Sequence, residues 1–365
     1  MKTILIAHNY SKDSFSYMSY ELANYLSKNN FKVVFVSHKP YFNEIKSVKN
    51  KNGELIITSW SSKKRPSGIK DVFWFLKIYK YHKPDFVIGH FVGANISILI
   101  SKIYSFGKTK CFIYYHTLSS QIEKDRPSNS FKYSFQKFRK KIFYKLCVDK
   151  FICPSELAKK DISESFNINP HSTRVILNAI EDRNNTINTC NPNQISYLGR
   201  LDSSKNVTLL VESFIEFIKQ NPTSNLKLNI AGTGSESKKI SSICSKHDFL
   251  IFKGKISYDK VDDLLSNSSY TIIPSLSDNL PTVGIESLMV GTPIIISDQA
   301  GLSNYCSNEK NSIVFSPSKK NLISIFEKIS TETYNENMRI EARRLFERKF
   351  HIETYFKEIK KLILN

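Results

Sequence analysis

Short runs of β-branched and aromatic residues alternate with longer amphipathic segments along the first half of the chain. In the first such segment, apolar residues recur at helical spacing, and Asn29 and Asn30 end it; they are Tyr17, Tyr20, Leu22, Tyr25 and Leu26. Alternating strands and helices are typical of a parallel sheet, so we expect one doubly wound domain here. The apolar runs predict its strands at residues 3–8, 32–38, 85–90, 110–116 and 150–155.

The alternation stops at residues 181–194, where Asn, Asp and Pro replace the apolar residues, and then it restarts. These residue types favour turns, so this stretch is the expected linker. The second half predicts strands at 195–199, 226–232, 249–254, 270–275 and 293–298, with helices near 206–220, 235–247, 258–266 and 283–290. The fold class is therefore α/β, with two Rossmann-like doubly wound domains. We expect them at 1–180 and 195–340, followed by a C-terminal helix at 341–365 that packs back on the first domain.

The charge is unevenly distributed. The chain carries 53 basic and 33 acidic residues, a net charge of +20, and residues 1–180 hold 30 of the basic and only 12 of the acidic ones. An anionic partner for this half is expected, which leaves nucleic acid, an acidic membrane surface and a phosphorylated substrate open. The 6 cysteines show no metal-ligand spacing and are typical of reduced thiols in a cytoplasmic protein. The longest apolar stretch, 86–100, is too short to span a membrane, and we expect no signal peptide.

Polar residues follow several predicted strands, at the edge where open α/β sheets bind ligands. Gly199 permits a tight turn, and Arg200 and Lys205 place two cations before the next helix. A guanidinium and an ammonium side by side suit a diphosphate, although a solvated surface pair would show the same pattern. The turn containing Gly232 and Gly234 lacks the third glycine of a dinucleotide fingerprint. It is interpreted either as a close approach to a ligand or as a plain tight turn.

A second cluster of polar residues surrounds the short predicted helix at 283–290. Pro281 and Gly284 begin it, and its free N–H groups would attract an anion. Asp278 precedes the helix and Glu286 lies inside it. Two carboxylates there can accept hydrogen bonds from sugar hydroxyls, but an acidic helix start alone would also explain them.

Together, these ordered segments resemble family 4 of the nucleotide-sugar glycosyltransferases, which are retaining enzymes with the GT-B fold, two Rossmann-like domains facing each other across a cleft. GRLDSSKN at 199–206 matches the family's Arg and Lys pair, and the spacing from Asp278 to Glu286 matches its E-x7-E element. CPSELAKKDI at 153–162 and VILNAIE at 175–181 are similar to the family's serine-led helix and to its turn before the second domain.

The resemblance implies a role for each matched residue. Arg200 and Lys205 would hold the diphosphate of the sugar donor, Glu286 the ribose, and Asp278 the transferred sugar. His116 matches a histidine that lines the reaction centre, but His8, His38 and His90 also end strands, as structural histidines often do. The implied catalytic residues are His116 and Asp278. The implied nucleotide-binding residues are Arg200, Lys205, Gly232, Gly234, Lys255, Ile256, Thr282, Val283, Gly284 and Glu286.

The chain departs from the family pattern in two places. Asp278 is one methylene shorter than the usual Glu, which bears on sugar identity, and the N-terminal loop 8–18 lacks the family's glycine pair. The chain also has no D-x-D motif, so we expect a metal-independent reaction with no cofactor. Cationic side chains and a helix terminus would then stabilise the leaving diphosphate of a UDP- or GDP-linked sugar.

The stretch 124–145 interleaves Lys and Arg with aromatic residues. It predicts either an interfacial helix on anionic lipid or a core-facing aromatic stripe with a solvated basic face. By analogy with the family, the resemblance implies a hexosyltransferase-type enzyme of bacterial surface polysaccharide biosynthesis (capsule, lipopolysaccharide O-antigen or exopolysaccharide). It would act on a saccharide or lipid-linked acceptor at the inner face of the cytoplasmic membrane. The alternatives are a nucleotide-sugar epimerase of similar fold and a basic nucleic-acid-binding protein, although we expect no nucleic acid partner.

Overall fold

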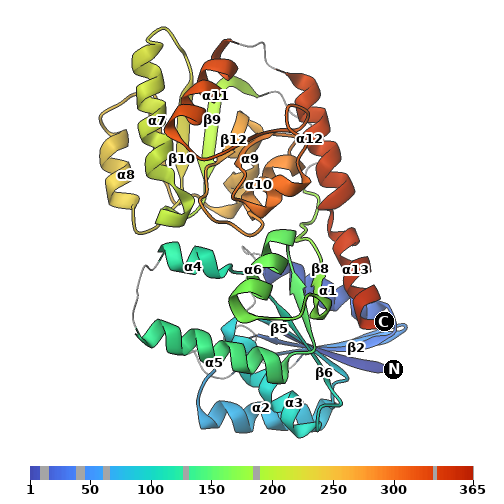
Figure 1. Cartoon of the computed structure of the whole chain (residues 1–365). Helices are drawn as coiled ribbons and strands as arrows, with labels where there is room; N and C mark the ends of the chain where they lie inside the picture. Colours follow the sequence, from blue (N-terminus) through green and yellow to red (C-terminus); the bar gives the residue numbers. More distant parts are fainter. Residues whose placement is uncertain are drawn as a thin grey trace. The chain divides into compact units, whose positions relative to one another are not determined.

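The computed structural model forms two compact units, shown in Figure 1. Unit 1 combines Met1–His116, Ser128–Leu177 and Ile352–Asn365, and unit 2 combines Thr117–Pro127 and Asn178–His351. The residues that the structure describes are 1–8, 16–37, 46–60, 66–125, 131–183, 190–331 and 335–364.

Unit 1 contains an eight-stranded sheet in the order β3-β4-β2-β1-β5-β6-β7-β8. Its strands are β1 (Lys2–Ala7), β2 (Phe31–Ser37), β3 (Lys46–Asn50), β4 (Gly53–Ser59), β5 (Phe86–His90), β6 (Lys110–Tyr114), β7 (Lys150–Cys153) and β8 (Thr173–Val175). Neighbouring strands are parallel, except for the antiparallel pair β3 and β4 at one edge. The strands β1, β2, β5, β6 and β7 are nearly continuous apolar runs, because helices cover a parallel sheet on both faces.

The helices of unit 1 complete its doubly wound architecture. They are α1 (Ser16–Lys28), α2 (Ile69–His82), α3 (Asn95–Tyr104), α5 (Phe131–Cys147), α6 (Glu156–Phe166) and α13 (Ile352–Leu364), with 3-10 turns η1 (Val92–Ala94) and η2 (Pro170–Ser172). α13 packs beside α1, and α3 packs beside both α2 and α5 (Figure 1). None of the described helices is long and apolar enough to cross a membrane.

Unit 2 is built on a six-stranded parallel sheet in the order β11-β10-β9-β12-β13-β14. Its strands are β9 (Asn191–Leu198), β10 (Lys227–Ala231), β11 (Leu250–Gly254), β12 (Ser268–Ile273), β13 (Ile294–Ser297) and β14 (Ser312–Phe315). Its helices are α4 (Ser119–Asp125), α7 (Val207–Gln220), α8 (Ser237–Cys244), α9 (Val261–Ser266), α10 (Thr282–Met289), α11 (Lys319–Thr331) and α12 (Glu336–Lys349), with 3-10 turns η3 (Ser203–Lys205), η4 (Tyr258–Lys260) and η5 (Gly301–Tyr305).

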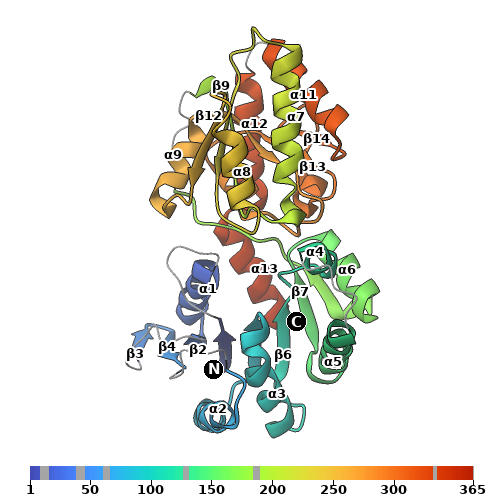
Figure 2. The same cartoon turned by 90° about the vertical axis from the view of Figure 1, so that its left-hand side faces the viewer.

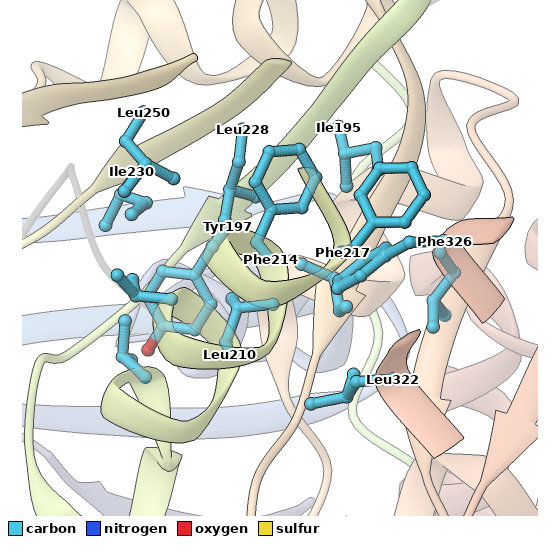
Figure 3. Close-up of a cluster of buried hydrophobic side chains, with 14 of the residues drawn as sticks. Ile195, Tyr197, Leu210, Phe214, Phe217, Leu228, Ile230, Leu250, Leu322 and Phe326 are labelled. Carbon is cyan, nitrogen blue, oxygen red and sulfur yellow. The ribbon is translucent and has the colours of Figure 1, made fainter. Parts of the chain in front are cut away.

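The core of unit 2 lies between the sheet and the neighbouring helices α7 and α11, which run side by side in Figure 2. Phe214 and Phe217 of α7 and Phe326 of α11 are fully buried against it. Figure 3 shows these three rings beside Ile195 and Leu228 of the sheet. The amphipathic pattern of the helices and the apolar pattern of the strands are thus satisfied by the same core.

Three parts of the domain prediction differ from the structure. Residues 117–125 belong to unit 2 rather than unit 1, because α4 binds loops of unit 2. The expected linker at 181–194 begins too late, because the second segment of unit 2 begins at Asn178. It also ends too late, because the polar start of β9 already pairs with β12 at Asn191. The expected single C-terminal helix is divided at Phe350 and His351, so that α12 packs in unit 2 and α13 in unit 1.

The strand prediction missed β3, β4, β8 and β14. β3 and β8 are short and largely polar, since they lie at the two edges of their sheet and bury few side chains. Every strand that the sequence predicted is present, and none of its ends differs by more than four residues.

Candidate functional site

Four loops that carry predicted site residues follow four neighbouring strands of unit 2. The strands β11, β10, β9 and β12 are parallel and adjacent in the sheet, so their carboxyl ends share one edge. The loops after them contain Lys255, Gly232, Arg200 and Asp278, respectively. Parallel pairing therefore gathers residues from distant parts of the chain at the edge where such sheets bind ligands.

The glycines of the β10 loop pack directly against the backbone of the β9 loop. Gly232 has a φ of +140°, and a Cβ there would lie 1.7 Å from the Gly199 carbonyl oxygen. A Cβ on Gly234 would lie 2.4 Å from the carbonyl oxygen of Leu201. Close packing of two backbones accounts for both glycines. The tight-turn interpretation thus has a structural reason, while contact with a ligand stays a prediction.

Lys205 and Asp278 form a largely buried ion pair. Their Nζ and Oδ2 atoms are 2.5 Å apart, and the side chains are 14% and 10% exposed. The backbone of Asp278 is fixed by a bridge to Ala300, and the Ser275 hydroxyl lies 3.4 Å from the same carboxylate oxygen. The two residues that the sequence assigned to the diphosphate and to the sugar therefore contact each other directly.

Arg200 is more accessible, with 55% of its side chain exposed. Its guanidinium donates to Asp202, at 2.5 Å, and to Asp125, at 3.2 Å. The other oxygen of Asp125 accepts the backbone N–H of Ser204 at 3.0 Å. Burial raises the pKa of Asp125, but the hydrogen bonds from Ser204 and Arg200 outweigh it and lower the pKa below its usual value. Asp125 is thus an ionised carboxylate held by a cation and a backbone N–H.

The helix α4, which carries Asp125, is the main part of the site that the sequence did not predict. Ser120 of α4 hydrogen-bonds Ser277 at 2.8 Å, and Lys124 donates to the carbonyl oxygen of Leu276. Both partners lie in the loop that contains Asp278. No signal in the sequence pointed to α4, because it lies within the half of the chain that otherwise forms unit 1.

Glu286 lies on the buried face of α10 beside Arg183. The Arg183 guanidinium forms a bidentate pair with Asp262, at 3.0 and 2.8 Å, and its Nη2 is 3.6 Å from Glu286 Oε1. Burial raises the pKa of Glu286 to about 7, because Arg183 lowers it less than burial raises it and Asp262 raises it further. The sequence missed Arg183 because it falls in the polar stretch that was predicted to be an unpacked linker.

The remaining nucleotide-binding candidates lie nearby in the same unit. Thr282 and Val283, both half-buried, form the first turn of α10. A Cβ on Gly284 would lie 2.4 Å from Leu302 Cδ2, so this glycine permits tight packing of the helix. Beyond β11 come Lys255, which is exposed, and Ile256, which is half-buried.

His116 lies in unit 1 within a stack of rings at the ends of β1, β5 and β6. His90 Nδ1 is 3.0 Å from His116 Nε2, and His8 stacks on His90 with ring centroids 4.3 Å apart. Phe91, which has a strained positive φ of 58°, stacks on the other side of His116 at 4.3 Å. Burial and His8 hold the pKa of His116 well below its usual value, so the imidazole is neutral at physiological pH.

Some predicted features of unit 1 lie outside the described residues. They include His38 and most of the N-terminal loop 8–18. Among the described residues, no group of three or more His, Cys, Asp or Glu side chains is arranged to hold a metal ion.

The basic aromatic stretch forms α5, preceded by α4, and it combines features of both interpretations. Tyr144 is buried, and Lys140 lies over its ring at 5.2 Å, where burial lowers the pKa of the lysine to about 8. Phe135 and Phe138, in contrast, are 51% and 59% exposed. They lie on one exposed helical face with Ile142 and Leu146, so α5 presents an apolar stripe together with its cations.

Two family models match nearly the whole chain between them. The model for glycosyl transferases group 1 matches residues 179–345, and the model for Glycosyltransferase Family 4 matches residues 16–183. An uncharacterized glycosyltransferase of Methanocaldococcus jannaschii is 23% identical over 258 residues, which cover 64% of this chain and 62% of the relative. A second uncharacterized glycosyltransferase of the same organism is 27% identical over 256 residues, which cover 63% of this chain and 59% of the relative. The matched region thus spans about three fifths of these relatives' length.

Solved structures with the same fold cover the chain completely. Sucrose-phosphate synthase from Thermosynechococcus elongatus has a TM-score of 0.75 at 15% identity, covering 100% of this chain and 98% of that one. HepE from Anabaena, solved in complex with UDP-glucose, has a TM-score of 0.72 at 12% identity, covering 100% and 99%. At such low identity the likeness establishes the fold alone.

Proposed function

Because the chain belongs to the family 4 glycosyltransferases with the GT-B fold, we propose that it transfers a sugar from a nucleoside diphosphate sugar to an acceptor, with retention of anomeric configuration. One observation carries the proposal: parallel strand pairing brings Arg200, Lys205 and Asp278 to one sheet edge in unit 2. These are the residues that match the family motifs. Their arrangement at this edge supports a site in unit 2 for the diphosphate and the transferred sugar.

In the proposed reaction the protein stabilises charge rather than forming a bond to the sugar. Lys205 and Arg200 neutralise the negative charge that develops on the departing diphosphate. Glu286 accepts hydrogen bonds from the ribose, and Asp278 orients the transferred sugar while holding Lys205 in place. No side chain is assigned as a nucleophile. With two cations in this role and no D-x-D motif in the sequence, the transfer is proposed to proceed without a metal.

Unit 1 is proposed to bind the acceptor, with His116 near the reacting hydroxyl. A neutral imidazole can exchange hydrogen bonds with a hydroxyl group but does not compete with the diphosphate as a cation. The exposed apolar and basic face of α5 supports a lipid-linked acceptor on an anionic membrane. Such a substrate is typical of bacterial surface polysaccharide assembly, which is the pathway class we propose by analogy with the family.

A nucleotide screen followed by a transfer assay tests this function. We expect UDP or GDP to raise the thermal unfolding temperature, and UDP is the first choice because HepE was solved with UDP-glucose. Transfer from the matching nucleotide sugar to an acceptor should continue in EDTA. Interconversion of the nucleotide sugar without an acceptor would instead identify an epimerase, and salt-sensitive DNA binding with no response to nucleotides would identify a nucleic-acid-binding protein.

A further inference from the structure

Arg183 lies in the stretch that the sequence predicted to be a linker, but in the structure it is firmly anchored within unit 2. Its side chain is only 25% exposed. Its guanidinium lies over the Tyr258 ring at 4.9 Å and also donates to the Tyr258 hydroxyl at 2.6 Å. Its backbone N–H donates to Met289 Sδ at 3.4 Å, at the end of α10. Together with the bidentate pair to Asp262, these contacts with η4, α9 and α10 fix Arg183 beside Glu286, which is far more than a solvated linker residue requires.

The position of Arg183 matters because Glu286 has little other support for its charge. The Glu286 side chain is 12% exposed, and burial of a carboxylate disfavours its ionised form. Asp262 on α9 accepts hydrogen bonds from Nε and Nη2 of Arg183, and its negative charge opposes ionisation of Glu286. Arg343 on α12, which packs against α10, is occupied by Asp182 and by the Met289 carbonyl oxygen. Arg183 is therefore the cation that favours ionised Glu286.

We propose that Arg183 is a positioning residue for the sugar donor, which holds the Glu286 carboxylate ionised and oriented to accept the ribose hydroxyls. The inference rests on the proposed function, which assigns Glu286 to the ribose. It goes beyond that function because Arg183 itself touches only Glu286 and the neighbouring side chains. Binding of the nucleotide would thereby depend on a residue near the start of the Asn178–His351 segment of unit 2.

A nucleotide titration across pH tests the proposal. Calorimetry would measure the affinity of the full chain for UDP and GDP, each beside its 2′-deoxy analogue, from about pH 6 to about pH 9. Arg183→Gln keeps hydrogen-bond donors for Asp262 but removes the positive charge. Arg183→Lys keeps the charge but lacks the planar guanidinium that binds Asp262 through two N–H groups. Arg174→Met is the matched control, since Arg174 is an arginine of unit 1 that pairs with Glu358. Thermal unfolding of each variant reports whether it is folded.

We expect Arg183→Gln to raise the pH at which affinity falls by about one unit, which weakens binding roughly fivefold at about pH 7, approaches tenfold at lower pH, and recovers in alkali. The loss should be much smaller for the 2′-deoxy analogue, which offers Glu286 fewer hydroxyls. Arg183→Lys should keep the wild-type pH midpoint, and Arg174→Met should change nothing.

The inference is overturned if folded Arg183→Gln binds with the wild-type pH profile, or if it loses the same factor for both forms of the nucleotide. A merely structural role predicts that second result. If Arg183→Gln does not fold, an Arg183→Lys variant that has lost the wild-type pH midpoint overturns the inference in the same way. Wild-type protein that binds neither nucleotide overturns the proposed function itself, and the inference with it.

Discussion

Asp125 contacts Arg200, which we propose binds the donor diphosphate, and a neighbouring backbone N–H in unit 2. Its carboxylate oxygens accept one N–H from Arg200 and the backbone N–H of Ser204. A phosphate oxygen carries the same charge and accepts the same kind of hydrogen bond. The nucleotide must therefore displace this carboxylate, and Asp125→Asn, which removes the charge but keeps the shape, should tighten binding of UDP or GDP.

The size of this effect follows from how exposed the pair is. Arg200 is 55% exposed and also pairs with Asp202, so the ion pair with Asp125 is screened and contributes about 0.2 to 1 kcal/mol. The hydrogen bond from Ser204 to a charged acceptor adds a comparable amount. Removal of the competing charge should then improve affinity by about 1 kcal/mol, or roughly fivefold.

Isothermal titration with UDP and GDP measures this change directly. Glu123→Gln is the matched control, because it removes the same charge from the same helix while Asp125 keeps its contacts with Arg200 and Ser204. Since the pKa of Asp125 lies below its usual value, the gain should be equal at about pH 6 and about pH 8. Combination with Arg200→Ala should reduce it. Unchanged or weaker binding by Asp125→Asn, or an equal gain from Glu123→Gln, would refute the reasoning.

Three further outcomes follow from the same geometry. Lys205→Ala should weaken nucleotide binding by about one to two decades, since a buried charge-assisted contact is worth roughly 1.5–3 kcal/mol. Asp278→Asn should impair transfer more than nucleotide affinity, because the amide oxygen can still accept a hydrogen bond from Lys205 and hold it in place; the reverse pattern would exchange their roles. Glu286→Gln should stabilise the nucleotide-free protein by on the order of 3 kcal/mol above neutral pH, because burial raises the pKa of Glu286 from 4.5 to about 7. That advantage should vanish below the unfolded pKa, where Glu286 is protonated in both states, and a pH-independent difference in denaturant melts would contradict it. The double variant Phe135→Ser, Phe138→Ser should sediment less with anionic vesicles than the wild type and bind nucleotide equally well. If the variant and the wild type sediment equally, this face of α5 is only solvated.

The fold was largely predictable because both domains follow local patterns. The apolar run at 32–38 and the amphipathic run at 206–220 correspond to β2 and α7, within one residue at each end. Prediction failed where local pattern and burial disagree. Residues 46–50 form β3 with four of five residues exposed, because an edge strand needs a neighbour rather than a core.

The sequence by itself determined which chemical groups are available and that they follow strands, since motif spacing is a local property. Only the tertiary structure decided their partners. Lys205 meets Asp278 because β9 lies next to β12 in the sheet, although 73 positions separate the two residues along the chain. Asp125 joins unit 2 and Arg183 supports Glu286 for the same reason: the order of strands and the packing of helices are set by long-range burial, which alternation of apolar and polar residues does not specify.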